Sequence, residues 1–494
     1  MGAALPILIA APLLAAAFSQ VVTSRRAMER LQSAQLLVLW AAMAAVVGGV
    51  SMGAPMALGA VLRADALSAF MDLMLAFVGG TALLYATGYM GEKLARGELT
   101  FLRYRRFFLY GDLFLFAMLL AVNLDNIAMM WIAVEASTIS AALSVGFDRT
   151  KAALEAGWKY IQLNFVGIAL ALFGTVLVYY TSEHLLGVSL EALRWSALAD
   201  VAGSLNPTVL KMAFIFVMIG YGTKAGVAPM HTWLPDAHAE APTPISAILS
   251  GLMLNLGLYA VLRLKSIVDP AVGAAFTGSV MLGLGLLSMA IAAAFMLIQR
   301  DYKRLLAYSS IEHVGVALIG FGVGGPLGTF AGFFHMLNHA LAKSAAFYSA
   351  GIVLLRHGHK IMGRIAGLLR QTPVAGAGLL LAAVALGGLP PFGLFASELL
   401  IATAAYRHHP ALAAAFLLLL VLAFSSLLIH LLRMTLGEPS EAAATVAPPA
   451  QLFMTSALAM NLTAMSFLGL FVPAFLLSLL FPMLSLFHVP PLVP

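Results

Sequence analysis

Long apolar segments separated by short polar ones follow one another along the whole chain. A membrane-spanning helix needs about 20 mostly apolar residues, and no segment alternates apolar and polar residues as the strands of a membrane barrel do. We therefore predict an all-α polytopic membrane protein with about fourteen transmembrane helices, forming a single membrane domain over 1–494. The predicted spans are 3–20, 34–53, 66–91, 107–122, 126–146, 156–181, 208–228, 244–264, 272–298, 304–323, 327–355, 374–402, 411–434 and 452–482.

Basic residues gather in alternate loops between these spans. Of the 27 lysines and arginines, 19 lie in loops that follow odd-numbered spans, six in loops that follow even-numbered spans, and two inside spans. Lysine and arginine are enriched in cytoplasmic loops. The distribution therefore predicts a protein integral to the cytoplasmic (inner) membrane, with both termini on the non-cytoplasmic side.

The composition agrees with a membrane protein and excludes soluble enzymes and proteins that depend on cysteine. Hydrophobic residues make up 62% of the chain and charged residues 10%, whereas soluble domains have roughly 45–50% and about 25%. A soluble enzyme is thereby excluded. The net charge of +6 follows from the basic loops, so it does not indicate a nucleic-acid partner. The chain has no cysteine, which excludes disulfides, thiol catalysis and cysteine-bound iron–sulfur clusters.

Four charged residues inside the predicted spans stand out: Glu135 in span 5, Lys224 in span 7, Lys343 in span 11 and Glu398 in span 12. An ionisable residue in the middle of a bilayer costs about 2.5–3.5 kcal/mol on insertion and is a functional candidate by default. The alternative is that Glu135 and Lys224 form a fixed buried ion pair. Buried pairs stabilise poorly compared with apolar packing, so we favour a role in proton transfer. In that role Glu398 is expected to pair with the terminal lysine, Lys343, before the proton leaves.

Span 11 carries the clearest polar pattern. His335, His339 and Lys343 recur every four residues and therefore share one face of a helix. Histidine titrates near neutral pH and can accept a proton on one nitrogen while donating from the other, so the stripe predicts a proton relay. Two histidines at this spacing also occur in zinc motifs. However, the usual carboxylate ligand is missing from this segment and Lys343 repels a cation, so we expect no metal.

Further polar residues surround these positions with weaker support. For His231 and His238 an ordinary role as interfacial capping residues is as well supported as a role in the relay, and His430 either ends the line of polar residues or extends to the membrane interface. We treat all six residues as secondary members of the relay. They are His231, Asp236, His238, Glu312, His313 and His430.

Two predicted spans are interrupted by glycine and proline beside a charge. Span 7 has Gly220, Gly226 and Pro229 around Lys224, and span 12 has the segment 387–393 just before Glu398. Paired interruptions of this kind indicate a transport site built on inverted repeats. We predict two five-helix repeats, spans 4–8 and 9–13, with helices 7 and 12 broken. The repeats cover about 107–265 and 272–434, flanked by helices in 1–91 and 452–482.

Several motifs carry a family resemblance. The segments 228–244 and 300–309 resemble antiporter-like subunits of respiratory complex I, of cation/proton antiporter complexes and of membrane-bound hydrogenases. The segments 310–315, 335–344 and 388–398 are similar to the F-type membrane subunit of hydrogenase-4 and of related formate hydrogenlyase complexes.

The resemblance implies a fourteen-helix fold with inverted repeats that translocates protons, or sodium ions, in step with electron transfer elsewhere. Other membrane and peripheral subunits would carry the nickel-iron centre and the iron–sulfur clusters. This chain would then bind no cofactor and hold no redox site of its own, although it belongs to an oxidoreductase complex. By position, Glu135, Lys224, Lys343 and Glu398 match the charged residues of the family.

One position departs from the family pattern. Many members have lysine or histidine in span 8, where this chain has Asn255. An amide hydrogen-bonds water but does not store a proton near pH 7. Two alternatives to a hydrogenase pump therefore stay open. The chain is either a structural membrane anchor with a non-functional relay, or a subunit of a cation/proton antiporter or of a quinone-reducing, complex I-like enzyme.

Overall fold

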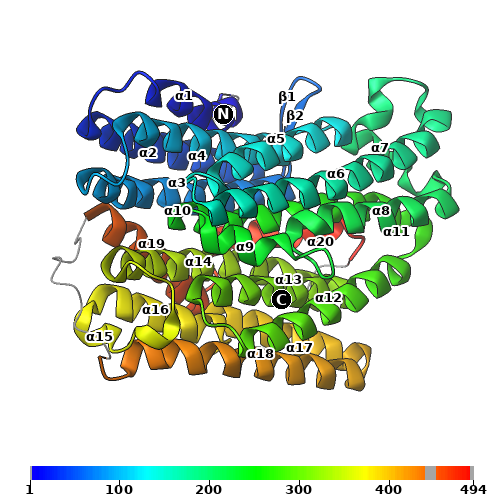
Figure 1. Cartoon of the computed structure of the whole chain (residues 1–494). Coiled ribbons are helices and arrows are strands. Elements are labelled where there is room, and N and C mark those ends of the chain that lie inside the picture. The colour runs from blue at the N-terminus through cyan, green and yellow to red at the C-terminus, as the bar shows by residue number, and fades with distance from the viewer. Residues whose placement is uncertain (1–2, 440–451, 490–494) are drawn as a thin grey trace.

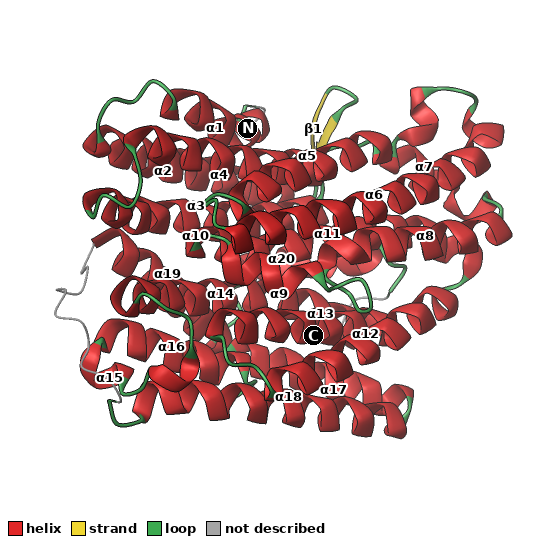
Figure 2. Ribbon diagram, in the orientation of Figure 1, coloured by secondary structure: helices red, strands yellow, loops and turns green. Residues whose placement is uncertain are grey.

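A computed structural model describes residues 3–439 and 452–489. The long helices lie roughly parallel to one another, with α1 and α2 at one side of the bundle and α16–α18 at the other (Figure 1). Helices dominate the described residues, and one short hairpin is present (Figure 2). The helices of the N-terminal half are α1 (Ala4–Ser19), α2 (Arg25–Ser51), α3 (Ala66–Ala95), α4 (Phe101–Val122), α5 (Ile127–Val145), α6 (Lys151–Leu186), α7 (Trp195–Val201), α8 (Pro207–Ala225), α9 (Trp233–Glu240), α10 (Thr243–Ile248) and α11 (Leu254–Val272).

The C-terminal half continues the same pattern of long helices joined by short loops. Its helices are α12 (Ala274–Leu297), α13 (Tyr302–Val323), α14 (Gly325–His357), α15 (Leu368–Gln371), α16 (Pro373–Leu386), α17 (Gly393–His408), α18 (Pro410–Leu436), α19 (Leu452–Leu470) and α20 (Ala474–Ser485). Short helical turns lie at Leu190–Leu193, Ala202–Ser204 and Met362–Arg364.

Ten helical segments of the described chain are long and apolar enough to cross a membrane. Three further apolar helices are shorter: α1, α16 and α20. Many of the long helices bury less than half of their most apolar stretch inside the protein. Large apolar side chains therefore cover much of the outer surface, as expected where lipid is the solvent. The protein is an all-α polytopic membrane protein, as the sequence predicts.

A β-hairpin adds an element that the sequence analysis does not anticipate. Strand β1 (Met56–Leu58) pairs antiparallel with β2 (Leu62–Ala64). The backbone of Arg63 donates to the carbonyl of Asn123 at 2.8 Å, which ties the hairpin to the end of α4. At three residues per strand, the hairpin is too short to show a period-two pattern in the sequence.

Two interruptions lie where glycine and proline cluster. Helix α8 ends at Ala225 and is followed by Gly226, whose φ of 75° is a left-handed conformation that suits glycine. Helix α9 begins at Trp233. The indole nitrogen of Trp233 donates to the carbonyl of Thr223 at 2.9 Å and bridges this gap. In the second half, α16 ends at Leu386 and α17 begins at Gly393. The second break lies within predicted span 12, whereas the first begins inside predicted span 7 and continues past its predicted end at residue 228. Each break lies near one charged residue of its span.

The C-terminal end of the described chain differs from the sequence prediction. The single span expected over 452–482 consists of two helices, α19 and α20, separated at Phe471–Pro473. Proline has no backbone N–H to continue the hydrogen-bond ladder, and Pro473 directly precedes the first residue of α20.

Candidate functional site

Lys224 lies in the last turn of α8 and is buried. Its ammonium group donates to Thr138 Oγ1 of α5 at 2.5 Å. Glu135 lies one turn earlier on α5 and is only partly buried, and neither of its carboxylate oxygens has a hydrogen-bond partner. The hydrogen-bonded pair that a fixed Glu135–Lys224 bridge would require is therefore not present. The lysine is held by a hydroxyl instead.

Asn255 lies in the first turn of α11, directly after a π-helical turn at Leu249–Met253. Such turns recur at functional sites because they release backbone groups from the regular ladder. The Asn255 amide donates to the carbonyl of Gly251 at 2.7 Å and to that of Met336 on α14 at 3.4 Å. Through these hydrogen bonds, Asn255 links the first half of the chain to α14 of the second half in the interior of the protein.

Lys343 is fully buried on α14, and α13 supplies its partners. Its ammonium group donates to the carbonyl of Leu306 at 2.9 Å and to the hydroxyl of Ser309. It thus resembles Lys224 in being held by a hydroxyl of a neighbouring helix. These partners orient the ammonium toward α13, and no ion pair to Glu398 is found within the described part of the chain.

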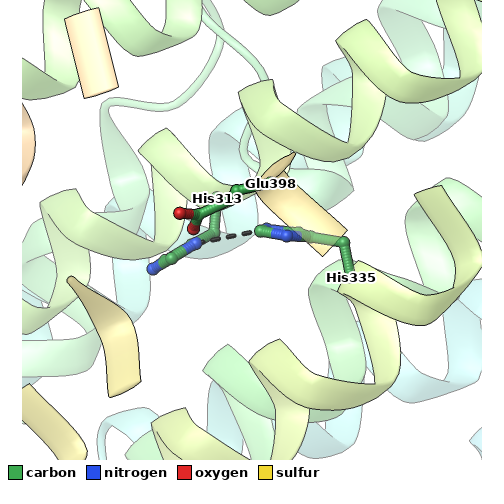
Figure 3. Close-up of side chains that lie close together, drawn as sticks. All are labelled: His313, His335 and Glu398. Atoms are coloured by element: carbon green, nitrogen blue, oxygen red, sulfur yellow. Dashed lines mark hydrogen bonds between the residues drawn. The ribbon is translucent and has the colours of Figure 1, made fainter. Parts of the chain in front are cut away.

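Three side chains from three helices converge in the second half (Figure 3). His313 Nδ1 of α13 lies 3.2 Å from His335 Nε2 of α14. Glu398 of α17 joins them, and one ligand-type atom from each residue lies within 4.8 Å of the others. His335 Nδ1 is 3.0 Å from the hydroxyl of Ser397, which itself donates to the carbonyl of Leu394 at 2.8 Å. Because that hydroxyl proton is engaged, His335 Nδ1–H donates to the oxygen and Nε2 carries the lone pair.

The same cluster extends to His339 and Glu312. The His339 ring is centred 5.1 Å from that of His313, and its Nε2 has no hydrogen-bond partner. Glu312 Oε2 lies 3.5 Å from His313 Nε2. Glu312 Oε1 and Glu398 Oε1 are buried without a hydrogen-bond partner. Unpartnered buried polar atoms are rare in proteins and demand an explanation; here they offer free acceptor positions along one line.

His231 and His238 lie at the broken helix of the first half. His238 is fully buried in α9, and its Nδ1 contacts the carbonyl of Leu234 at 2.9 Å while Nε2 is unpartnered. His231, in the loop between α8 and α9, is buried with an unpartnered Nδ1. Both histidines therefore have a free nitrogen inside the protein.

Asp236 and His430 lie apart from this buried line. Asp236 forms ion pairs with Lys159 at 3.2 Å and Arg304 at 2.7 Å, where it joins α6, α9 and α13. His430 is half-buried on α18 and lines a pocket beside Arg433.

Two buried carboxylates escaped the sequence analysis. Asp112 of α4 accepts hydrogen bonds from the amides of Gln32 and Gln35 at 3.0 and 2.9 Å. Asp72 of α3 accepts one from Asn123 at 2.8 Å. Both are fully buried. Each lies within an apolar predicted span, so the argument that makes Glu135 and Glu398 candidates applies to these two acids as well.

An ion pair lies at the end of the bundle that carries the hairpin. Arg263 donates from two nitrogens to the two oxygens of Asp65, each at 2.5 Å, and also to Ser68 and Tyr259. Burial raises the pKa of Asp65, but the charge and hydrogen bonds of Arg263 outweigh it, so this pKa lies below its ordinary value of 3.8. The guanidinium also stacks 4.4 Å from the centre of the Trp195 ring. The pair is thus fully satisfied, unlike the acids of the second half.

Comparisons with known proteins agree with this architecture. The family model described as NADH:quinone oxidoreductase/Mrp antiporter, transmembrane, matches residues 125–426, which is more than half of the chain. The hydrogenase-4 component F homolog of Methylacidiphilum infernorum is 42% identical over 381 residues, covering 77% of this chain and 80% of the relative.

Solved structures share the fold over nearly the full length. A chain of the membrane-bound sulfane sulfur reductase, an archaeal respiratory membrane complex, is similar with a TM-score of 0.85 at 24% identity, covering 99% of this chain and 98% of the other. A chain of respiratory complex I from Thermus thermophilus has a TM-score of 0.73 at 25% identity, covering 94% and 97%. The chain therefore belongs to the NADH:quinone oxidoreductase/Mrp antiporter family, as an antiporter-like membrane subunit.

Proposed function

We propose that this chain translocates protons within a membrane-bound nickel-iron hydrogenase or formate hydrogenlyase complex. The assignment to that complex is supported by the 42% identical relative, which is a hydrogenase-4 component F homolog. The redox chemistry would take place in partner subunits that carry the nickel-iron centre and iron–sulfur clusters. This chain would contribute the ion path across the membrane and bind no redox cofactor.

The observation that carries the proposal is the buried cluster around His335. His313, His335 and His339 lie ring to ring, with centroids 5.1–6.4 Å apart, and Glu312 and Glu398 flank them with free oxygens. Histidine can pass a proton from one nitrogen to the other. Such a row of buried titratable groups has little structural value, because unpaired buried acids are costly.

A route through the whole chain follows from the positions of the lysines. Lys224 would exchange a proton with the second half past Asn255, and Glu135 would stabilise the protonated lysine. Asn255 hydrogen-bonds carbonyl groups on both sides but stores no proton, so water would carry the proton across this point. Lys343 would receive it and pass it to His339.

The last step of this route differs from the one that the sequence indicated. Glu398 does not pair with Lys343 in the structure. It lies with His313 and His335 instead. We therefore place Glu398 after the histidines, as the group that accepts the proton from His335 before exit.

The finer topology belongs to the same proposal. We infer fourteen spans, with α8–α9, α10–α11, α16–α17 and α19–α20 each counted as one span, and both termini on the non-cytoplasmic side. Spans 4–8 and 9–13 would form inverted repeats over about 107–265 and 272–434, within one membrane domain. The two broken helices, each beside a buried charge, support this arrangement.

The proposal is tested first by its partners. The tagged chain is purified in mild detergent and the co-purifying subunits are identified by mass spectrometry. Nickel-iron and iron–sulfur subunits are expected. Recovery of small antiporter subunits alone would overturn the hydrogenase assignment in favour of a cation/proton antiporter.

The second test separates a pump from a structural anchor. The wild-type complex and a complex that carries Lys224→Met are each reconstituted in vesicles. Proton uptake and hydrogenase turnover are measured in both. We expect uptake to be lost while the complex assembles and the redox reaction continues. Equal uptake by the variant would identify the chain as an anchor. Uptake that requires sodium would identify Na⁺ as the transported ion.

A further inference from the structure

We propose that His313, His335 and Glu398 form a binding site for a divalent transition-metal ion of the Zn²⁺ class. Two imidazoles and a carboxylate are the ligand set of many zinc sites. The three residues come from α13, α14 and α17 and point toward one another (Figure 3). Their convergence is a property of the fold, because the residues are far apart in the sequence.

The separation of the two histidine nitrogens already matches a metal site, and Glu398 lies beside them. His313 Nδ1 and His335 Nε2 are 3.2 Å apart, which is close to the separation of two nitrogens that are each about 2.0–2.1 Å from a tetrahedral zinc ion. One ligand-type atom from each of the three residues lies within 4.8 Å of the others. Glu398 Oε1 has no hydrogen-bond partner and is thus free to coordinate.

The orientation of His335 is already that of a metal ligand. Its Nδ1–H donates to Ser397 Oγ at 3.0 Å, and Ser397 in turn donates to the carbonyl of Leu394. A second hydrogen bond of this kind fixes the tautomer and aims the other nitrogen at the metal. Nε2 therefore presents its lone pair toward His313 and Glu398.

The charge around the cluster favours a dication. When ionised, Glu398 supplies one negative charge, and Glu312, 3.5 Å from His313 Nε2, supplies a second. The ammonium of Lys343 donates to Leu306 O and Ser309 Oγ, so it does not occupy the site itself, although its charge still acts on His313 and Glu312. Two carboxylates balance the ion, which reduces the cost of burying it.

Coordination has a consequence for transport that rests on the proposed function. A bound ion occupies the lone pairs of His313 and His335, so neither can accept a proton. Zn²⁺ would then block the path. The site itself depends on the geometry alone, and the experiment separates the two statements.

The test measures metal binding to the purified complex. Zn²⁺ is added during equilibrium dialysis and counted by mass spectrometry, and Co²⁺ is used as a spectroscopic probe. We expect about one ion per chain and the visible absorption of a four-coordinate nitrogen/oxygen site. His335→Gln and Glu398→Gln should remove both signals, whereas His238→Gln, which changes a buried histidine outside the cluster, should retain them. Retention of the signals in His335→Gln and Glu398→Gln would overturn the site.

A second variant guards against misfolding. Ser397→Ala keeps all three ligands and removes only the acceptor that orients His335, so it should weaken Zn²⁺ binding by about 10–100-fold with an unchanged elution profile. Unchanged affinity in Ser397→Ala would argue against His335 Nε2 as a ligand. Proton uptake is then measured with and without Zn²⁺. If the complex binds Zn²⁺ but shows no proton uptake even without Zn²⁺, the metal site is supported and the proposed function is refuted.

Discussion

At the hairpin end of the bundle, Asp65 and Arg263 satisfy each other completely, whereas the acids around His335 have unpartnered oxygens. The first pair has two direct hydrogen bonds plus those of Arg263 to Ser68 and Tyr259. In the second region Glu312 and Glu398 each have a free buried oxygen. A satisfied pair holds its protonation state and fixes helices in place. Groups with free positions can exchange protons or bind an ion.

The largest effect is expected at the satisfied pair. Asp65→Asn leaves Arg263 buried without a counter-charge, and the loss of one partner of a buried pair costs about 3–5 kcal/mol. We expect a clear fall in thermal unfolding temperature and poor assembly. Because the pKa of Asp65 is lowered on folding, the pair stabilises the protein above pH 3.8 and loses this contribution as the pH falls through the lower folded value.

The acid dependence supplies a control for that variant. The unfolding temperature of the wild-type protein is measured as the pH is lowered. In Asp65→Asn, the part of this pH dependence that comes from the Asp65 carboxyl group should be absent. An unchanged unfolding temperature in Asp65→Asn would show that the pair contributes nothing to the fold, and the contrast between the two regions would fail.

The next effect concerns the two lysines, which should be needed for transport and not for folding. Lys224→Met and Lys343→Met replace a buried ammonium by an apolar chain of similar length. We expect proton uptake in vesicles to fall by about 100-fold or more, as on removal of a proton-transferring group, with normal assembly. Loss of assembly in both variants would instead place the lysines with Asp65 and Arg263 as structural charges.

The hydroxyls that hold the lysines should differ in importance. Within the described chain, Lys224 donates to Thr138 alone, whereas Lys343 also donates to Leu306 O. Thr138→Val removes one hydrogen bond to a charged group, worth about 1.5–3 kcal/mol, and Ser309→Ala should cost less because a partner is retained. The pH profile of proton uptake is measured in both variants, and Thr138→Val should change it more than Ser309→Ala does. Equal changes in the two variants would contradict this prediction.

The smallest effect is expected at the second helix break. A Cβ at Gly388 would overlap the Glu398 carboxylate, and the residue has a φ of 62°. Gly388→Ala should therefore displace Glu398 and cost about 1–3 kcal/mol. Gly363→Ala, where a Cβ meets open space, is the control. Zn²⁺ binding and proton uptake are the measurements, and identical values for both variants would show that Glu398 is not held against the break.

Periodic features of the chain were predictable because they depend on neighbours in sequence. Apolar segments long enough to span a bilayer identify the helical membrane class, and the four-residue spacing of His335, His339 and Lys343 places them on one helix face. The two breaks followed from glycine and proline, which act on the local backbone. The hairpin was missed because strands of three residues leave a weak pattern. The division of the last predicted span into α19 and α20 was missed although Pro473 marks it in the sequence.

Partners across helices could not be predicted in the same way. The sequence suggested Glu135 with Lys224 and Glu398 with Lys343, since opposite charges in a membrane are expected to pair. The structure instead gives the lysines Thr138 and Ser309, and it brings Glu398 to His313 and His335. Which side chains meet depends on helix rotation and crossing, and these are set by packing along the full length of each helix.

The sequence by itself determined the membrane class, the family motifs and the candidate residues, since hydropathy and local backbone chemistry are properties of contiguous residues. Only the tertiary structure decided which charged groups have hydrogen-bond partners and which have unpartnered atoms. It also supplied the carboxylate that the histidine stripe of α14 lacks, from Glu398 on α17. The physical reason is that hydrogen bonds and ligand distances are fixed within a few tenths of an ångström, by helices that meet only after the chain has packed.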